Sequence, residues 1–119
     1  MLVFDNARDR PAGRYSRALE LALDVPNGTA AKVWEFRPQP SIYAPIVGSA
    51  RRLDNGNTVV SFGTRAGLLD ASGPISAFET RSDGQVTRIL RISGGELLNY
   101  RSTPLRDIAG EVVVVPPTR

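Results

Sequence analysis

One stretch decides the fold: Gly48-Ser49-Ala50-Arg51-Arg52-Leu53-Asp54-Asn55-Gly56-Asn57-Thr58-Val59-Val60-Ser61-Phe62-Gly63. Its two arms, residues 49–53 and 58–63, flank an Asp-Asn-Gly-Asn turn. Asn-Gly between apolar stretches is a strong hairpin signal, because these residues tolerate the positive φ of a tight turn. The stretch therefore predicts two antiparallel strands.

Similar turn signals punctuate the rest of the chain, and the pieces between them are short. They stand at Pro11-Ala12-Gly13, Pro26-Asn27-Gly28, Ser72-Gly73-Pro74, Ser82-Asp83-Gly84 and Gly94-Gly95. We expect further strands at Leu2–Asp5, 17–23, 31–37, Ile75–Thr80, Val86–Ile92, 97–101 and 111–115. The chain is predicted to be all-β and antiparallel.

Residues 16–24 allow two interpretations. Ala, Leu and Glu are strong helix formers, so propensity alone favours a helix there. Leu19, Leu21 and Leu23, however, repeat with the period of two that puts them on one face of a strand. We expect a strand, because nine residues between turn signals are marginal for a helix and the neighbouring segments are strands.

A diffuse internal repeat relates the two halves of the chain. Leu2-Val3-Phe4-Asp5-Asn6 can be laid on Val59-Val60-Ser61-Phe62-Gly63, and Asn27-Gly28 falls close to Asp83-Gly84 in the same superposition. Short strands repeating at this spacing are typical of β-propeller blades. Taken alone, the repeat leaves a sandwich or an open barrel as alternatives.

The composition excludes several kinds of site. The 119 residues include neither His nor Cys, which removes His-based acid–base catalysis, Ser-His triads, thiolate metal sites and disulfides. Fifteen basic and twelve acidic residues leave a net charge of only +3, with scattered arginines, so we expect no nucleic-acid partner. We expect no cofactor and no metal site.

No targeting or membrane signal stands out in the sequence. No apolar run approaches the roughly 18–20 residues of a membrane-spanning helix, and no basic segment followed by an apolar one marks the N-terminus. We therefore expect no membrane partner, and the compartment stays undetermined.

Five segments together resemble one protein family. They are residues 48–63, Phe4-Asp5-Asn6, Ser16-Arg17-Ala18-Leu19-Glu20, Lys32-Val33-Trp34-Glu35-Phe36 and Asn99-Tyr100-Arg101. In this order and spacing they are similar to the C-terminal third of the bacterial arylsulfotransferases. The resemblance implies a six-bladed propeller and transfer of a sulfuryl group from a phenolic sulfate to a phenol, through a sulfated histidine and without a nucleotide cofactor.

The same resemblance places the chemistry outside this sequence. In the family the catalytic histidines and arginine precede the Phe-Asp-Asn strand, so they have no counterparts here and we assign no catalytic residue. The chain is expected to be inactive alone, either as a piece of a longer enzyme or as a free-standing remnant. Family members are often exported.

The expected architecture is roughly two four-stranded blades over residues 1–103, with 104–119 as a tail or an extra strand. Each blade needs neighbours on both faces, so we expect a homo-oligomer, in which about three copies complete a cyclic ring. The run Val112-Val113-Val114-Val115 is unsuited to an exposed edge. It is expected to complete a blade of its own chain or of a neighbour.

Four residues are candidates for binding a small anionic aromatic or a sugar. Asn6 and Arg17 are expected near blade loops as donors to an anion, although a turn-forming Asn and a surface arginine are the simpler interpretation. Tyr43 and Arg101 are expected to supply an aromatic wall and a guanidinium. The alternative function is a non-catalytic binding or scaffold propeller built from several copies.

Overall fold

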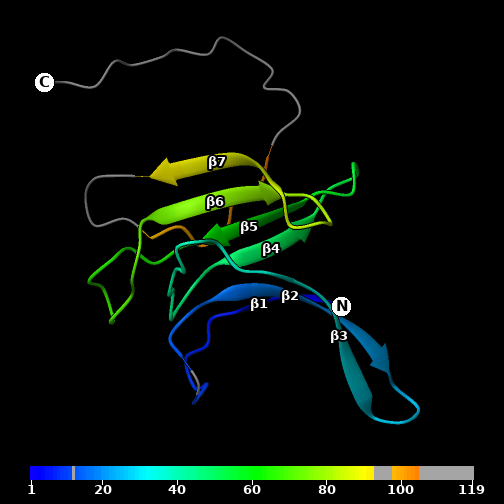
Figure 1. The fold of residues 1–119 in the computed structure, drawn as a ribbon. Coiled ribbons are helices and arrows are strands. Elements are labelled where there is room, and N and C mark those ends of the chain that lie inside the picture. The colour runs from blue at the N-terminus through cyan, green and yellow to red at the C-terminus, as the bar shows by residue number, and fades with distance from the viewer. Residues whose placement is uncertain (12, 93–97, 105–119) are drawn as a thin grey trace, which may run out of the picture.

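The computed structural model describes residues 1–11, 13–92 and 98–104. Its strands are β1 (Leu2–Asp5), β2 (Arg17–Asp24), β3 (Thr29–Phe36), β4 (Ser49–Arg52), β5 (Thr58–Phe62), β6 (Ile75–Thr80) and β7 (Val86–Ile92). They form two antiparallel sheets (Figure 1). The prediction of an all-β chain is confirmed, and the described residues contain no helix.

The first sheet, sheet 1, has the order β1-β2-β3. Residues 17–24 form a strand, so the helical alternative is wrong and the period-two leucines outweigh helix propensity. Tertiary pairing decides this, because β2 lies between two partners, with Phe4 opposite Ala18 and Ala18 opposite Phe36. Among the described residues this sheet has three strands rather than the four expected of a blade.

The second sheet, sheet 2, has the order β4-β5-β6-β7, in which each strand follows its neighbour through a tight turn or loop. The Asp-Asn-Gly-Asn turn is formed as predicted: the Leu53 amide donates to the Asn57 carbonyl at 2.8 Å, and the Gly56 amide donates to the Leu53 carbonyl at 3.0 Å. Gly56 has φ +83°, which glycine adopts without steric cost.

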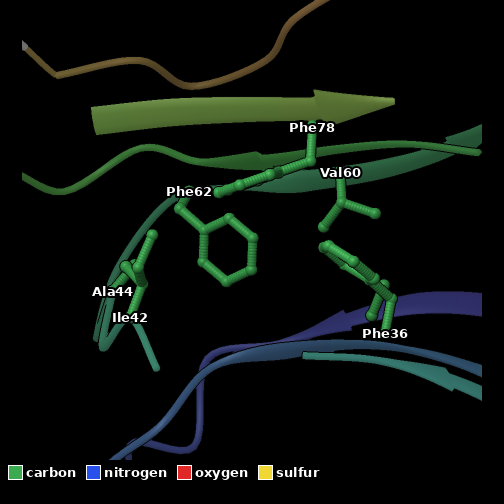
Figure 2. Packing of buried hydrophobic residues seen from close by; sticks show 7 residues of the cluster. Phe36, Ile42, Ala44, Val60, Phe62 and Phe78 are labelled. Carbon is green, nitrogen blue, oxygen red and sulfur yellow. The ribbon is translucent and has the colours of Figure 1, made fainter. Parts of the chain in front are cut away.

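The two sheets stack face to face around an aromatic seam. All four phenylalanines of the chain lie there, Phe4 and Phe36 from sheet 1 and Phe62 and Phe78 from sheet 2. Phe62 is the centre: its ring lies 5.2 Å from that of Phe4 and 5.7 Å from that of Phe78, both edge-to-face. Figure 2 shows Phe36 of sheet 1 and Phe62 of sheet 2 pointing into the space between the sheets. Consecutive sheets stacked in this way are propeller-like.

The segment that joins the sheets helps to fill the seam. Ile42 and Ala44, which follow the proline-rich stretch after β3, belong to the same buried cluster (Figure 2). Between the sheets Arg52 also reaches Glu20 as an ion pair, and its guanidinium lies 5.4 Å from the Trp34 ring centre. Trp34 thus packs against the buried cluster.

The strand expected at 97–101 is wrong for the part that the structure describes. Residues 98–101 are irregular, because Asn99 is held by polar contacts instead of a strand ladder: its amide donates to the Gly63 carbonyl at 3.0 Å, and its side chain donates to Ser61 at 3.0 Å. Residues 98–104 cross the face of sheet 2 that points away from sheet 1. Leu97 and the predicted strand 111–115 lie outside the described residues.

Candidate functional site

Charged side chains gather where the strands of sheet 1 end. Antiparallel pairing sets Asp5 opposite Arg17, and Glu35 lies at the far end of β3. The Arg17 Nε is 2.9 Å from an Asp5 carboxylate oxygen, and its Nη1 is 3.2 Å from one of Glu35. Ion pairs between the three side chains therefore link the three strands of sheet 1 at one end.

These ion pairs shift the pKa values of Glu35 and Arg17. Burial raises the pKa of Glu35, but hydrogen bonds from Lys32 and Arg17 outweigh it and hold that pKa below its usual value. For Arg17, burial lowers the pKa while hydrogen bonds to Asp5 and Glu35 raise it, and the net direction is upward. Both groups are therefore charged at neutral pH.

The side chain of Asn6 is hydrogen-bonded within the protein. Its side-chain amide donates to the carbonyls of Ala44 at 2.7 Å and Val47 at 2.9 Å, so both of its N–H groups are occupied. Asp5 beside it accepts from the Ala7 amide at 2.8 Å, the Asx turn of the simpler interpretation. Asn6 ties the end of β1 to the segment that leads into sheet 2.

Tyr15 organises a cluster of arginines that the sequence interpretation missed. The guanidinium carbons of Arg37 and Arg10 lie 3.8 Å and 3.9 Å from its ring centre, and that of Arg17 lies 5.8 Å away. Arg10 is also paired with Asp5 at 3.0 Å. Only the mixture of Tyr and Arg in loops at the strand ends hinted at this cluster.

Arg37 differs from the other arginines around Tyr15. Its Nε donates to the Ser41 hydroxyl at 2.8 Å, and its position over the Tyr15 ring is favourable for a cation. It has no carboxylate within ion-pair distance in the described part of the chain. Arg37 is exposed, so this guanidinium is positioned by the protein and open to an anion.

The structure separates the remaining two candidates. Tyr43 is only 7% exposed, next to the Ala44 carbonyl that Asn6 binds, and the Arg14 guanidinium lies 5.9 Å from its ring centre. It shares the end of the molecule with Asn6 and Arg17 but lies in the interior. Arg101 is elsewhere, with Arg51 and Phe4 in the lining of an open cleft of about 570 Å³ between β1 and β4.

Comparison with known proteins assigns the family. The family model described as Arylsulfotransferase (ASST) matches residues 1–100. The chain belongs to the arylsulfotransferase family. It is also 30% identical over 83 residues to the arylsulfate sulfotransferase AssT of Escherichia coli O6:H1 (strain CFT073). No solved structure matches it.

The match covers very different shares of this arylsulfotransferase family member and of its relative AssT. The match to AssT takes in 62% of the chain but only 14% of AssT. The two stacked sheets thus correspond to a small part of that relative. In this arylsulfotransferase family member, the guanidinium groups of Arg10, Arg17 and Arg37 surround the Tyr15 ring.

Two other properties bear on the site. In the described ranges, no group of three or more His, Cys, Asp or Glu side chains is arranged to hold a metal ion. Likewise, no helix there is long and apolar enough to cross a membrane.

Proposed function

We propose that this chain is a non-catalytic part of an arylsulfotransferase-type protein, which holds the anionic end of a phenolic sulfate but does not transfer its sulfuryl group alone. The observation that carries the proposal is the pairing of family membership over residues 1–100 with the complete absence of histidine. The family resemblance implies that the sulfuryl group passes through a histidine.

The role of the guanidinium follows from charge and shape. A sulfate monoester presents a group of oxygens with a single negative charge, and a planar guanidinium can donate to two of those oxygens at once. Arg37 has an anchored Nε and no carboxylate partner among the described residues, whereas Arg10 and Arg17 already pair with acids. Arg37 is therefore the residue we assign to the sulfate, and Tyr15 keeps its guanidinium in position.

The proposal modifies the sites expected from sequence. Asn6 and Arg17 stabilise the loops around the site and do not contact the ligand, since their donors are occupied within the protein. Tyr43 is too buried to form an open aromatic wall. Arg101 lines a different cleft and has no part in this binding site.

The test uses p-nitrophenyl sulfate as ligand, with phenol as acceptor. Calorimetric titration should detect weak binding to the wild-type chain and lose it in Arg37→Ala, while Arg91→Ala, a change at an exposed arginine of β7, keeps it. Release of p-nitrophenol by the chain alone would contradict the non-catalytic role. Equal binding by Arg37→Ala and the wild type would contradict the assignment of Arg37.

A further inference from the structure

Two stretches of the chain lie side by side at the loop end of sheet 1, one leading into β2 and the other following β3. The Ser16 amide donates to the Ile42 carbonyl at 2.8 Å, and the Ser16 hydroxyl accepts from the Ala44 amide at 2.8 Å. Each stretch has one tyrosine next to these hydrogen bonds, Tyr15 in the first and Tyr43 in the second. The hydrogen bonds therefore hold the two tyrosines on adjacent stretches.

An arginine from each stretch lies over the tyrosine of the other. The Arg37 guanidinium carbon is 3.8 Å from the Tyr15 ring centre, and that of Arg14 is 5.9 Å from the Tyr43 ring centre. Both contacts fall within the roughly 6 Å over which a ring face attracts a cation. Both arginines are exposed, so these crossed contacts present two guanidiniums to solvent at the same end of the molecule.

The carboxylate that pairs with Arg14 can be displaced. Arg14 Nη1 lies 3.2 Å from an Asp70 carboxylate oxygen, but the two side chains are 70% and 77% exposed. An ion pair this open to water gains little from its charges and is screened by salt. Arg10 and Arg17 differ, because their ion pairs are mostly shielded from water. A carboxylate on a ligand can therefore replace Asp70 on Arg14, since it offers the guanidinium the same pair of oxygens.

We propose that the aryl sulfates bound here have a carboxylate on the ring, with the sulfate on Arg37 and the carboxylate on Arg14. The inference rests on the proposed function, from which it takes the position of the sulfate, and it adds the class of ligand. A planar guanidinium donates two parallel N–H groups to a carboxylate, so the second contact is directional as well as electrostatic. The ring of the ligand then bridges the two stretches that Ser16 joins.

The second charge should strengthen binding by a moderate factor. Hydrogen bonds to charged groups are stronger than neutral ones, but Arg14 is exposed and must first release Asp70. We therefore expect an aryl sulfate with a ring carboxylate to bind roughly three- to tenfold more tightly than its methyl ester, which keeps the ring and the sulfate but lacks the second charge. The difference should shrink as salt is added, because the contact with Arg14 is open to water.

The test is calorimetric titration of the full chain with meta- and para-carboxyphenyl sulfate and with the methyl ester of each. The two isomers place the carboxylate at different distances from the sulfate, so at least one acid should show the full preference over its ester. Arg14→Ala should abolish that preference and leave binding of the esters unchanged.

Two more variants serve as controls in these titrations. Asp70→Asn should raise the affinity for the acid and leave that for the ester unchanged, because Arg14 then has no internal carboxylate to release. Arg91→Ala, at an exposed arginine of β7, should match the wild type with all four ligands. The replaced side chains are exposed, so the circular dichroism spectra of all the variants should match that of the wild type.

The results separate this inference from the proposed function. A wild type that binds both acids no more tightly than their esters would overturn the inference and leave the sulfate site in place, and so would an Arg14→Ala variant that keeps the preference. An Arg37→Ala variant that binds the esters as tightly as the wild type would contradict the proposed function and, with it, the inference. Absence of binding by all four ligands would overturn both.

Discussion

Replacement of Phe62 by alanine should test the seam between the sheets most directly. The ring is fully buried, and truncation of such a phenylalanine costs about 3–5 kcal/mol. Its two edge-to-face contacts, with Phe4 and Phe78, each account for roughly 0.5–1.5 kcal/mol of that loss. A domain of this size is stable by only about 5–15 kcal/mol, so the change removes a large fraction of the free energy of unfolding.

Urea titration followed by tryptophan fluorescence is the suitable assay. Trp34 is the only tryptophan and lies in the seam, with its ring centre 6.4 Å from that of Phe36. With a slope of about 2 kcal/mol per molar urea, Phe62→Ala should lower the midpoint by roughly 1.5–2.5 M. Protein concentration must be held constant, because association would shift the midpoint as well.

A graded series decides whether the ring contacts matter. Phe62→Leu keeps an apolar side chain but loses both ring pairs, so it should cost about 1–3 kcal/mol. Val25→Ala, at an exposed turn, should stay within about 0.5 kcal/mol of the wild type. If Phe62→Ala shifted the midpoint no more than Val25→Ala does, the assignment of the seam as the core would be refuted.

Three further changes probe the end of sheet 1. Because the pKa of Glu35 is held low in the fold, wild-type stability should fall as the pH drops from about 5 to about 3, and Glu35→Gln should flatten that decline in urea titrations at each pH. Gly48→Ala should destabilise more than Gly84→Ala in thermal unfolding, since both have positive φ but a Cβ at Gly48 would collide with Phe4 while none is near Gly84. Asn6→Ala should cost roughly 1–3 kcal/mol of stability, because two carbonyls lose their donor, and leave calorimetric sulfate binding intact; loss of binding without loss of stability would instead make Asn6 a ligand residue.

The strands were predictable because they are short and bounded by residues with special backbone preferences. In β2 the alternation of leucines decided correctly against helix propensity. The strand expected at 97–101 is wrong for residues 98–101, because their pattern resembles a strand while the polar side chain of Asn99 makes other hydrogen bonds. Composition and periodicity do not contain that information.

The candidate site was less predictable than the fold. The sequence indicates that Asn6 and Arg17 lie at strand ends, but not that their donors are occupied by groups far along the chain. The cluster around Tyr15 joins loops that precede β2 and follow β3, so only tertiary structure brings Arg37 onto that ring. Residues that form a cation–π pair have no fixed spacing in the sequence, so no pattern predicts the pair.

Because every phenylalanine lies in the seam, the contact between the two sheets is stronger than a contact that either sheet could make on its outward face, which points away from the seam. The seam joins its sheets through four large rings, whereas the exposed apolar side chains on the outward faces, such as Leu23, Val33 and Leu90, are aliphatic. A contact made on those faces would therefore be weaker than the seam, and dilution or mild denaturant would break it before the seam. The two sheets of this chain would stay joined to each other and would not have to refold before binding a partner again.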